Sequence, residues 1–249
     1  MIEALTGISL SELFAIWAII FVAGFVRGLT GIGLAVVLVP LVNLVLPPER
    51  TVLLAILIGC LAGLMGYRAA WRNVDKPLIV TMTVATVAAT PLGLYLLFQT
   101  PDDVSRIAIA IIAMLAFFVI ILPRSPLPPA GTLPAILTGF LTGLLGAFAA
   151  IPGPPVIHYF VRSGVPAVKA RDALIVIFLW APLAVALIAL AAGKLDWQLG
   201  ALALACFAPL AIGNAIGARF FGRVPEKYWR FMIVTLIAVA AAGAVFRVF

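Results

Sequence analysis

Two ionisable side chains stand inside long apolar stretches of the sequence, Arg27 within residues 13–46 and His158 within residues 132–162. Such groups are costly inside a membrane, so they mark candidate functional positions there. A guanidinium binds an anion through forked hydrogen bonds, and an imidazole carries a proton close to neutral pH. The pair therefore indicates anion binding at Arg27 and makes His158, the only histidine, a candidate for proton coupling.

Asn43 is related to His158 by position, because it stands 115 residues earlier, at the matching place of the first half of the chain. Both side chains are expected to project just past a break in a helix. There they either contact a substrate or satisfy nearby backbone groups. Arg27 has a similar alternative, since it would otherwise bind the exposed carbonyl groups of a broken helix.

The remaining reactive residue types argue against an enzyme. All nine acidic residues fall at segment ends or in loops, so a buried carboxylate relay is absent and a cationic substrate would lack a counter-charge. Cys60 and Cys206 stand alone in apolar runs, without the spacing of a metal site or a disulfide framework. We predict no catalytic residue, no metal site and no cofactor.

Composition places these side chains in a lipid bilayer. Hydrophobic residues make up 65% of the 249 positions and charged residues 10%, with a mean hydropathy of +1.27. Almost uncharged runs at 51–67, 77–98, 104–122 and 170–192 are each close to the ~20 residues that a membrane-spanning helix needs. They are continuous, unlike the alternating segments of an outer-membrane barrel. The sequence therefore predicts an all-α polytopic membrane protein.

The chain ends and the net charge add two expectations. The opening Met-Ile-Glu lacks the basic stretch of a secretory signal, so we expect the N-terminus to be retained. The formal charge of +7 is scattered over short loops and does not gather into a basic face for nucleic acid. The bilayer is the expected partner, and association into a homo-oligomer is left open.

An internal repeat divides the chain into halves at 1–124 and 125–249, which together form one membrane domain. The segment Pro101–Arg106 returns as Pro225–Arg230, with the same spacing of proline, acid and arginine. Four residues near the start of each half also recur at one offset of 115. These are Gly24, Gly28, Gly31 and Pro40, repeated as Gly139, Gly143, Gly146 and Pro155.

Each half opens with a segment too long for one span and interrupted by glycine or proline. It is either one long kinked helix or two half-helices that meet at a non-helical tip. Basic residues of short loops gather on the cytoplasmic side of a membrane. If each opening segment crossed the membrane once, the basic residues would be divided almost evenly between the two sides. If both opening segments double back, eleven basic residues lie on one side and only Arg50, Arg106, Lys194 and Arg247 lie on the other. We therefore predict two inverted-topology repeats, each a hairpin opening segment followed by three transmembrane helices.

Broken helices in inverted repeats point to a transporter binding site near the bilayer midplane. A broken helix exposes N–H groups that suit an anion in a dehydrated site. The alternative is that the glycines only let helices pack closely, but duplication of the break at one place favours a site. The predicted substrate-binding residues are Arg27, Thr30, Gly31, Gly33, Asn43, Gly146, Gly153 and His158.

The two openings, Gly24–Gly33 with Pro40 and Gly139–Gly146 with Pro155, resemble those of the TauE/SafE family of sulfite exporters, the toluenesulfonate uptake permease group. The resemblance covers nearly the whole chain and includes the four-plus-four segment pattern. Members often carry a richer glycine run at both breaks, where this chain has Ala147–Ala150 in the second half. The resemblance implies a bacterial inner-membrane permease for sulfite, sulfonates, sulfoacetate or related organic anions.

The leading hypothesis is a secondary transporter that works by alternating access, with the anion held between the two helix tips. A channel-like anion conductor using the same tips is the first alternative. An intramembrane enzyme is the second, although a lone histidine and two distant cysteines supply no catalytic cluster. An assembly factor without a substrate is a third. The sequence leaves open the identity of the substrate, the direction of transport and the coupling ion.

Overall fold

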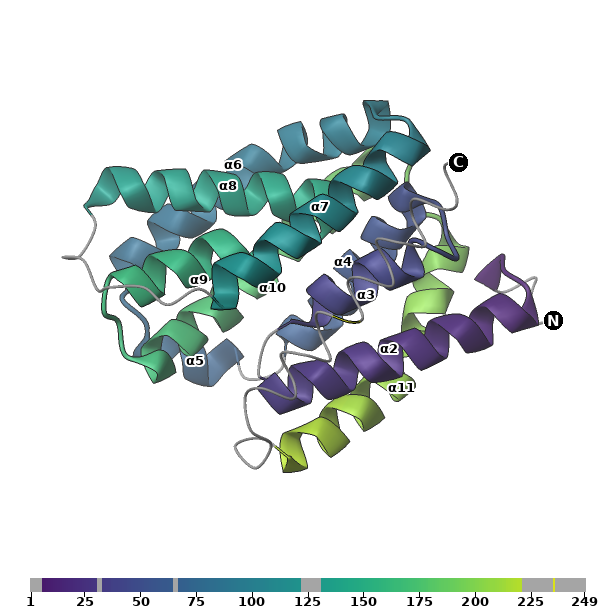
Figure 1. Cartoon of the computed structure of the whole chain (residues 1–249). Helices are drawn as coiled ribbons and strands as arrows, with labels where there is room; N and C mark the ends of the chain where they lie inside the picture. Colours follow the sequence, from purple (N-terminus) through teal and green to yellow (C-terminus); the bar gives the residue numbers. More distant parts are fainter. Residues whose placement is uncertain (1–5, 31–32, 65–66, 122–130, 221–234, 236–249) are drawn as a thin grey trace. The chain divides into compact units, whose positions relative to one another are not determined.

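The computed structural model describes residues 6–30, 33–64, 67–121, 131–220 and 235 (Figure 1). Within them the chain forms ten helices and no strand, as expected for an all-α membrane protein. Five of these helices are long and apolar enough to cross a bilayer. They are α2 (Leu10–Thr30), α6 (Lys76–Gln99), α8 (Thr132–Ala149), α10 (Ala167–Ala191) and α11 (Trp197–Arg219).

The chain divides into two compact units that interleave along the sequence. Unit 1 comprises Met1–Ile58, Thr100–Met114 and Leu195–Phe249, and unit 2 comprises Gly59–Gln99 and Leu115–Lys194. Each unit therefore takes segments from both predicted halves. The interpretation of residues 1–124 and 125–249 as two inverted repeats stays a prediction.

The shorter helices complete the two units. Unit 1 holds α3 (Leu34–Val42), and unit 2 holds α5 (Tyr67–Asn73) and α9 (Gly153–Arg162). α4 (Pro48–Gly63) and α7 (Asp102–Ile121) each contribute to both units. The expected continuous run at 51–67 is interrupted, because α4 ends at Gly63 and α5 begins at Tyr67.

The start of α2 is fixed by a capping box. The Ser9 N–H donates to Glu12 Oε2 at 2.8 Å, and the Glu12 N–H donates back to Ser9 Oγ at 3.3 Å. These bonds satisfy backbone donors that a helix start leaves free, and the Glu12 carboxylate also favours the positive end of the helix dipole. The first apolar run therefore begins as a helix directly after Ser9.

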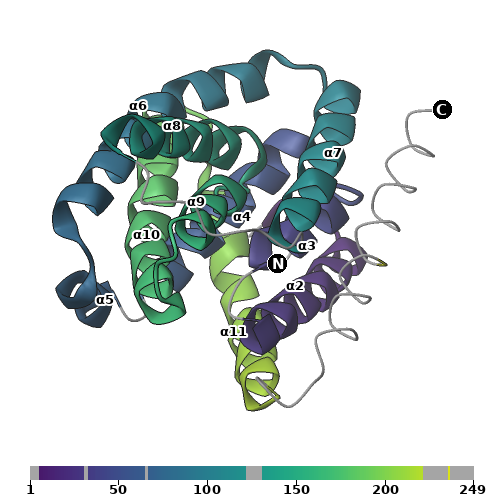
Figure 2. The same ribbon diagram turned by 60° about the vertical axis from the view of Figure 1, so that its left-hand side comes forward.

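Glycines join α2 to α11 in unit 1, where the two helices lie side by side (Figure 1 and Figure 2). A Cβ atom at Gly24 would lie 2.6 Å from the Leu210 carbonyl oxygen, and one at Gly28 would overlap the Asn214 carbonyl. From α11, Gly213 meets Phe21 in the same way. Residue numbers rise together along both helices, so α2 and α11 pack in parallel with their backbones in close approach.

The same construction joins α8 to α6 in unit 2. Added Cβ atoms at Gly139 and Gly143 would overlap the carbonyl oxygens of Met82 and Thr86. The residue numbers of the contacting positions again rise together along both helices, so α8 and α6 are parallel too. Four of the six repeated glycines, Gly24, Gly28, Gly139 and Gly143, thus serve helix packing, which was the alternative interpretation of these residues.

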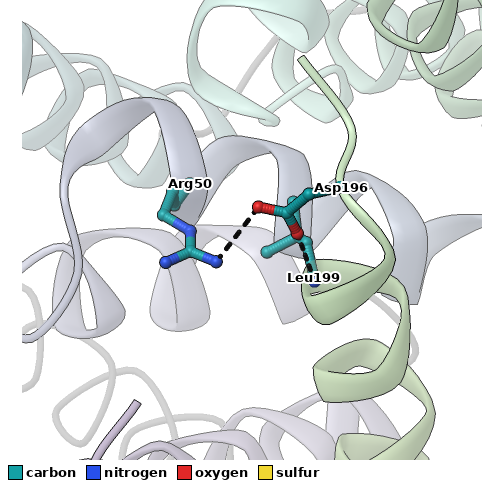
Figure 3. Close-up of polar contacts among 3 residues, drawn as sticks. All are labelled: Arg50, Asp196 and Leu199. Carbon is teal, nitrogen blue, oxygen red and sulfur yellow. Dashed lines mark hydrogen bonds and ion pairs between the residues drawn. The ribbon is translucent and has the colours of Figure 1, made fainter. Parts of the chain in front are cut away.

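The first opening segment doubles back within unit 1. Arg50, in the first turn of α4, donates from Nη2 to Asp196 Oδ2 at 3.4 Å, and Asp196 caps α11 by accepting from the Leu199 N–H at 2.6 Å (Figure 3). A Cβ atom at Gly7, just before α2, would lie 2.8 Å from Gln198 Oε1. The starts of α2, α4 and α11 are therefore neighbours, so α3 must return along α2. If the first opening segment had crossed the membrane only once, Arg50 and the loop that holds Asp196 would lie on opposite sides of the membrane.

The second opening segment doubles back within unit 2. The Asn73 side-chain amide, just before α6, donates to Asp172 near the start of α10 at 3.1 Å. At the far end, Lys194 Nζ lies 4.8 Å from the centre of the Phe98 ring. α6 and α10 therefore run in parallel, and α8 is parallel to both. Because α8 and α10 begin at the same end, the chain between them must return through α9.

Candidate functional site

The first break follows a full-length helix and not a half-helix. α2 runs for 21 residues to Thr30, and α3 has only nine. We expected two half-helices meeting near the midplane, and the lengths of these two helices contradict that expectation. The helix continues through Gly28, because that glycine packs against α11. Gly33 has φ 98° and precedes α3 without a side-chain cap. That left-handed conformation favours glycine, and it lets the chain reverse. Gly31 lies outside the described residues.

Arg27 lies in the last turn of α2, three residues before the helix ends, and is partly buried. Its positive charge faces the negative end of the helix dipole, which is favourable. In the part of the chain that the structure describes, no hydrogen bond or ion pair engages its guanidinium. Arg27 and Thr30 thus belong to the last turn of α2, directly before the break, and α3 starts after the break without a side-chain cap.

Asn43 is not beside this break. It ends α3, ten residues after Gly33, which is about 15 Å along a helix. Its side chain is 3% exposed, and Oδ1 is buried with no hydrogen-bond partner among the described residues. The expectation that Asn43 projects just past the break is therefore wrong, because α3 stays helical as far as Val42. Its role in binding stays a prediction.

The second break is made by Ala150, which takes a left-handed conformation with φ 54° at the end of α8. Its N–H and that of Ile151 both donate to the Leu145 carbonyl, the latter at 3.4 Å. These bonds satisfy a carbonyl that the helix end would leave free. Gly146 is not the break itself. It lies inside α8, where an added Cβ would be 3.1 Å from Pro152 Cβ, so the returning chain passes close by.

Because a left-handed alanine is strained by roughly 1 kcal/mol, we expect Ala150→Gly to stabilise the protein by up to about 1 kcal/mol. For a chain of this size that corresponds to a rise of about 2–4 °C in the melting temperature. Thermal unfolding of the detergent-purified protein measures it. Ala149→Gly, in the right-handed last turn of α8, is the matched control and should lower the melting temperature. A fall with Ala150→Gly would contradict the assigned backbone conformation.

α9 begins at Gly153, with Pro152 before it and no side-chain cap. Pro154 and Pro155 follow at positions where a helix start normally offers N–H donors, and proline has none. The second break therefore presents fewer backbone donors than the first, where α3 opens without proline in its first turn.

His158 lies midway along α9 and is partly buried. It follows Gly153 by five residues, so it is closer to its break than Asn43 is to the first. The two side chains are therefore not equivalent in place, although they share the offset of 115. Proton coupling by His158 stays a prediction.

Several polar residues have ordinary structural contacts. Arg50 is paired with Asp196 at an exposed helix start, as expected for a loop charge. Thr90 donates to the Thr86 carbonyl within its own helix at 3.0 Å. Neither contact points to a ligand.

Thr142 is a candidate that sequence reasoning did not single out. It is fully buried in α8, and its hydroxyl oxygen has no hydrogen-bond partner among the described residues. The available signal was its position, since Thr142 aligns with Arg27 at the offset of 115 that relates the two glycine runs.

Comparison with known families gives one match. A family model described as "Sulfite exporter TauE/SafE" matches residues 16–244. That range includes both breaks and all the described spans except the first turns of α2. No curated protein and no solved structure matches the chain.

Proposed function

Because the chain belongs to the sulfite exporter TauE/SafE family, we propose that it is a secondary transporter for a small anion in the bacterial inner membrane. The family is one of membrane transporters, and the five candidate spans accord with a multi-pass membrane protein. The finer proposal concerns the substrate and the mechanism. Candidate substrates are sulfite, sulfonates, sulfoacetate and related organic anions.

One observation carries the preference for an anion: a cation lies at the first helix break. Arg27 stands within one turn of the end of α2, and α3 starts after the break without a side-chain cap. A guanidinium and free backbone N–H groups are both donors, and both favour negative charge. A cation would meet repulsion there. The placement of this cation supports the preference for an anion.

Movement of the anion is proposed to follow alternating access. Both opening segments double back and both end in a short helix, α3 in unit 1 and α9 in unit 2. In the proposed mechanism these short helices shift while the glycine-packed pairs stay fixed. His158 is the proposed group for any coupled proton.

Transport is tested with purified protein in liposomes, against sulfite, sulfate, thiosulfate, taurine, sulfoacetate and simple carboxylates. We expect saturable uptake of at least one sulfur anion, accelerated by the same anion on the opposite side. Flux that does not saturate and shows no such acceleration would favour an anion channel. No flux of any panel anion, in a folded and inserted preparation, would remove the sulfur-anion assignment.

A further inference from the structure

Aromatic side chains of α5 and α10 form a cluster in unit 2. The rings of Tyr67 and Trp71, one turn apart on α5, stack with 6.2 Å between their centres and 14° between their planes. Trp180 of α10 packs edge-on against Tyr67 at 6.4 Å, and its Nε1–H donates to the Tyr67 hydroxyl at 3.1 Å. Trp180 is nevertheless 42% exposed. Tyrosine and tryptophan gather where hydrocarbon meets water, so the cluster indicates that α5 lies at that level of the membrane.

The position of α5 along α10 supports this placement, since the two helices pack on each other (Figure 1). The start of α5 contacts Trp180, and its last residue, Asn73, contacts Asp172. The two helices are therefore antiparallel. Asp172 directly precedes the uncharged part of α10, residues 173–191. The end of α5 thus lies where this candidate span leaves the apolar layer.

Cations accompany the aromatic rings of α5. Arg68 and Arg72 are exposed and stand one turn apart on the helix, each next in sequence to one of the stacked rings. Lys76, at the start of α6, places Nζ 6.0 Å from the centre of the Trp71 ring. A cation at that distance from an aromatic face is attracted to it. Positive charge is therefore held beside the aromatic cluster from two helices.

The positive charge at this end of unit 2 is not neutralised by the protein. The start of α10 adds Lys169 and Arg171, both exposed. The carboxylates in these segments are Asp75 and Asp172, and Asp172 accepts from the Asn73 amide. Among the described residues, no ion pair joins either carboxylate to a cation of α5, α6 or α10. The end therefore presents an excess of free cations to an anionic partner.

We propose that the side chains of Arg68, Arg72 and Lys76, with the rings of Tyr67 and Trp71, bind the headgroup of an anionic phospholipid. Arginine and lysine both hydrogen-bond phosphate oxygens, and basic side chains beside membrane spans attract anionic lipids. A lipid also places acyl chains against the exposed rings, which a soluble phosphate ester does not do. The inference concerns the membrane and is independent of the transported anion.

Lipid titration of the detergent-purified protein tests the proposal through the melting temperature. Dioleoyl phosphatidylglycerol and dioleoyl phosphatidylcholine share their acyl chains and differ in net charge, and glycerol 3-phosphate supplies the phosphate without the chains. We expect phosphatidylglycerol, at a hundredfold excess over its dissociation constant, to raise the melting temperature about 5 °C above its value in phosphatidylcholine. An equal rise with phosphatidylcholine would contradict the preference for negative charge. An equal rise with glycerol 3-phosphate would replace the lipid by a soluble phosphate ester.

Arg72→Gln has a matched control in Arg219→Gln, since both arginines are exposed in the last turn of a helix. We expect Arg72→Gln to weaken phosphatidylglycerol binding about fivefold and the double variant Arg68→Gln/Arg72→Gln about 30-fold. Arg219→Gln should stay within about twofold of the unsubstituted protein. Equal weakening by Arg72→Gln and Arg219→Gln would show a general effect of charge and overturn the local site. In phosphatidylcholine all variants should melt with the unsubstituted protein, and a lower value for Arg72→Gln would make this arginine a structural residue of α5 instead.

Discussion

Gly143→Ala is expected to lower the melting temperature by about 10 °C. The new Cβ would overlap the Thr86 carbonyl oxygen and lie 3.0 Å from Ala89 Cβ. Thr86 cannot move aside cheaply, because its hydroxyl also donates to the Gly139 carbonyl at 3.0 Å. The two backbones must therefore separate, at a cost of about 3 kcal/mol. At roughly 2–4 °C per kcal/mol for a chain of this length, the shift is large.

Gly200→Ala is the matched control for this prediction. Gly200 also lies inside a helix, but nothing lies within 4 Å of an added Cβ there. Alanine is the better helix former, so Gly200→Ala should stabilise the protein by up to about 1 kcal/mol. Thermal unfolding in one detergent compares the two variants. Equal shifts in the same direction would contradict close packing of α8 on α6.

The helix-packing role of glycine explains why the breaks were located only approximately from the sequence. The cluster from Gly24 to Gly33 contains both packing glycines and the residue at the break. Composition does not separate these uses, because a glycine that permits close approach and one that permits φ of 98° look identical in sequence. Only Gly33 has the left-handed backbone among the described glycines of this cluster. In the second half the break falls on Ala150, which no glycine pattern marks.

The sequence also did not identify the helices against which the opening helices pack. Small residues at Gly24 and Gly28 indicate a close-packed face, but the periodicity does not name the helix that covers it. That helix is α11, which begins about 170 residues after α2 ends. Loop charge was more informative, since it grouped Arg50 with the loop that leads into α11. The Arg50–Asp196 contact agrees with that placement.

The candidate site was predicted in part. The sequence placed Arg27 beside a helix break, and the structure locates it in the last turn before that break. It did not foresee that α3 stays helical as far as Val42, which removes Asn43 from the break. Nor did it mark Thr142, because burial and a missing hydrogen-bond partner are properties of packing and not of residue type.

Arg27→Gln is expected to raise the concentration for half-maximal anion flux by about 10–100-fold. A hydrogen bond to a charged group contributes about 1.5–3 kcal/mol, and each 1.4 kcal/mol is a factor of ten in affinity. Glutamine keeps donors of similar reach but removes the charge. Arg27→Lys keeps the charge and loses the planar fork, so its affinity should fall between the two. Concentration dependence of sulfite uptake into liposomes measures all three proteins.

Arg50→Gln separates a local effect from a general loss of positive charge. Arg50 lies at an exposed helix start and is paired with Asp196, so its removal should leave affinity unchanged and cost little stability. If Arg27 only stabilises the end of α2, Arg27→Gln would lower the melting temperature and leave the half-maximal concentration as it was. That result would remove the cation from the binding site and, with it, the main physical reason for an anionic substrate. A weaker affinity at an unchanged melting temperature requires the guanidinium to act on the anion itself, because helix stability is then not what the substitution altered.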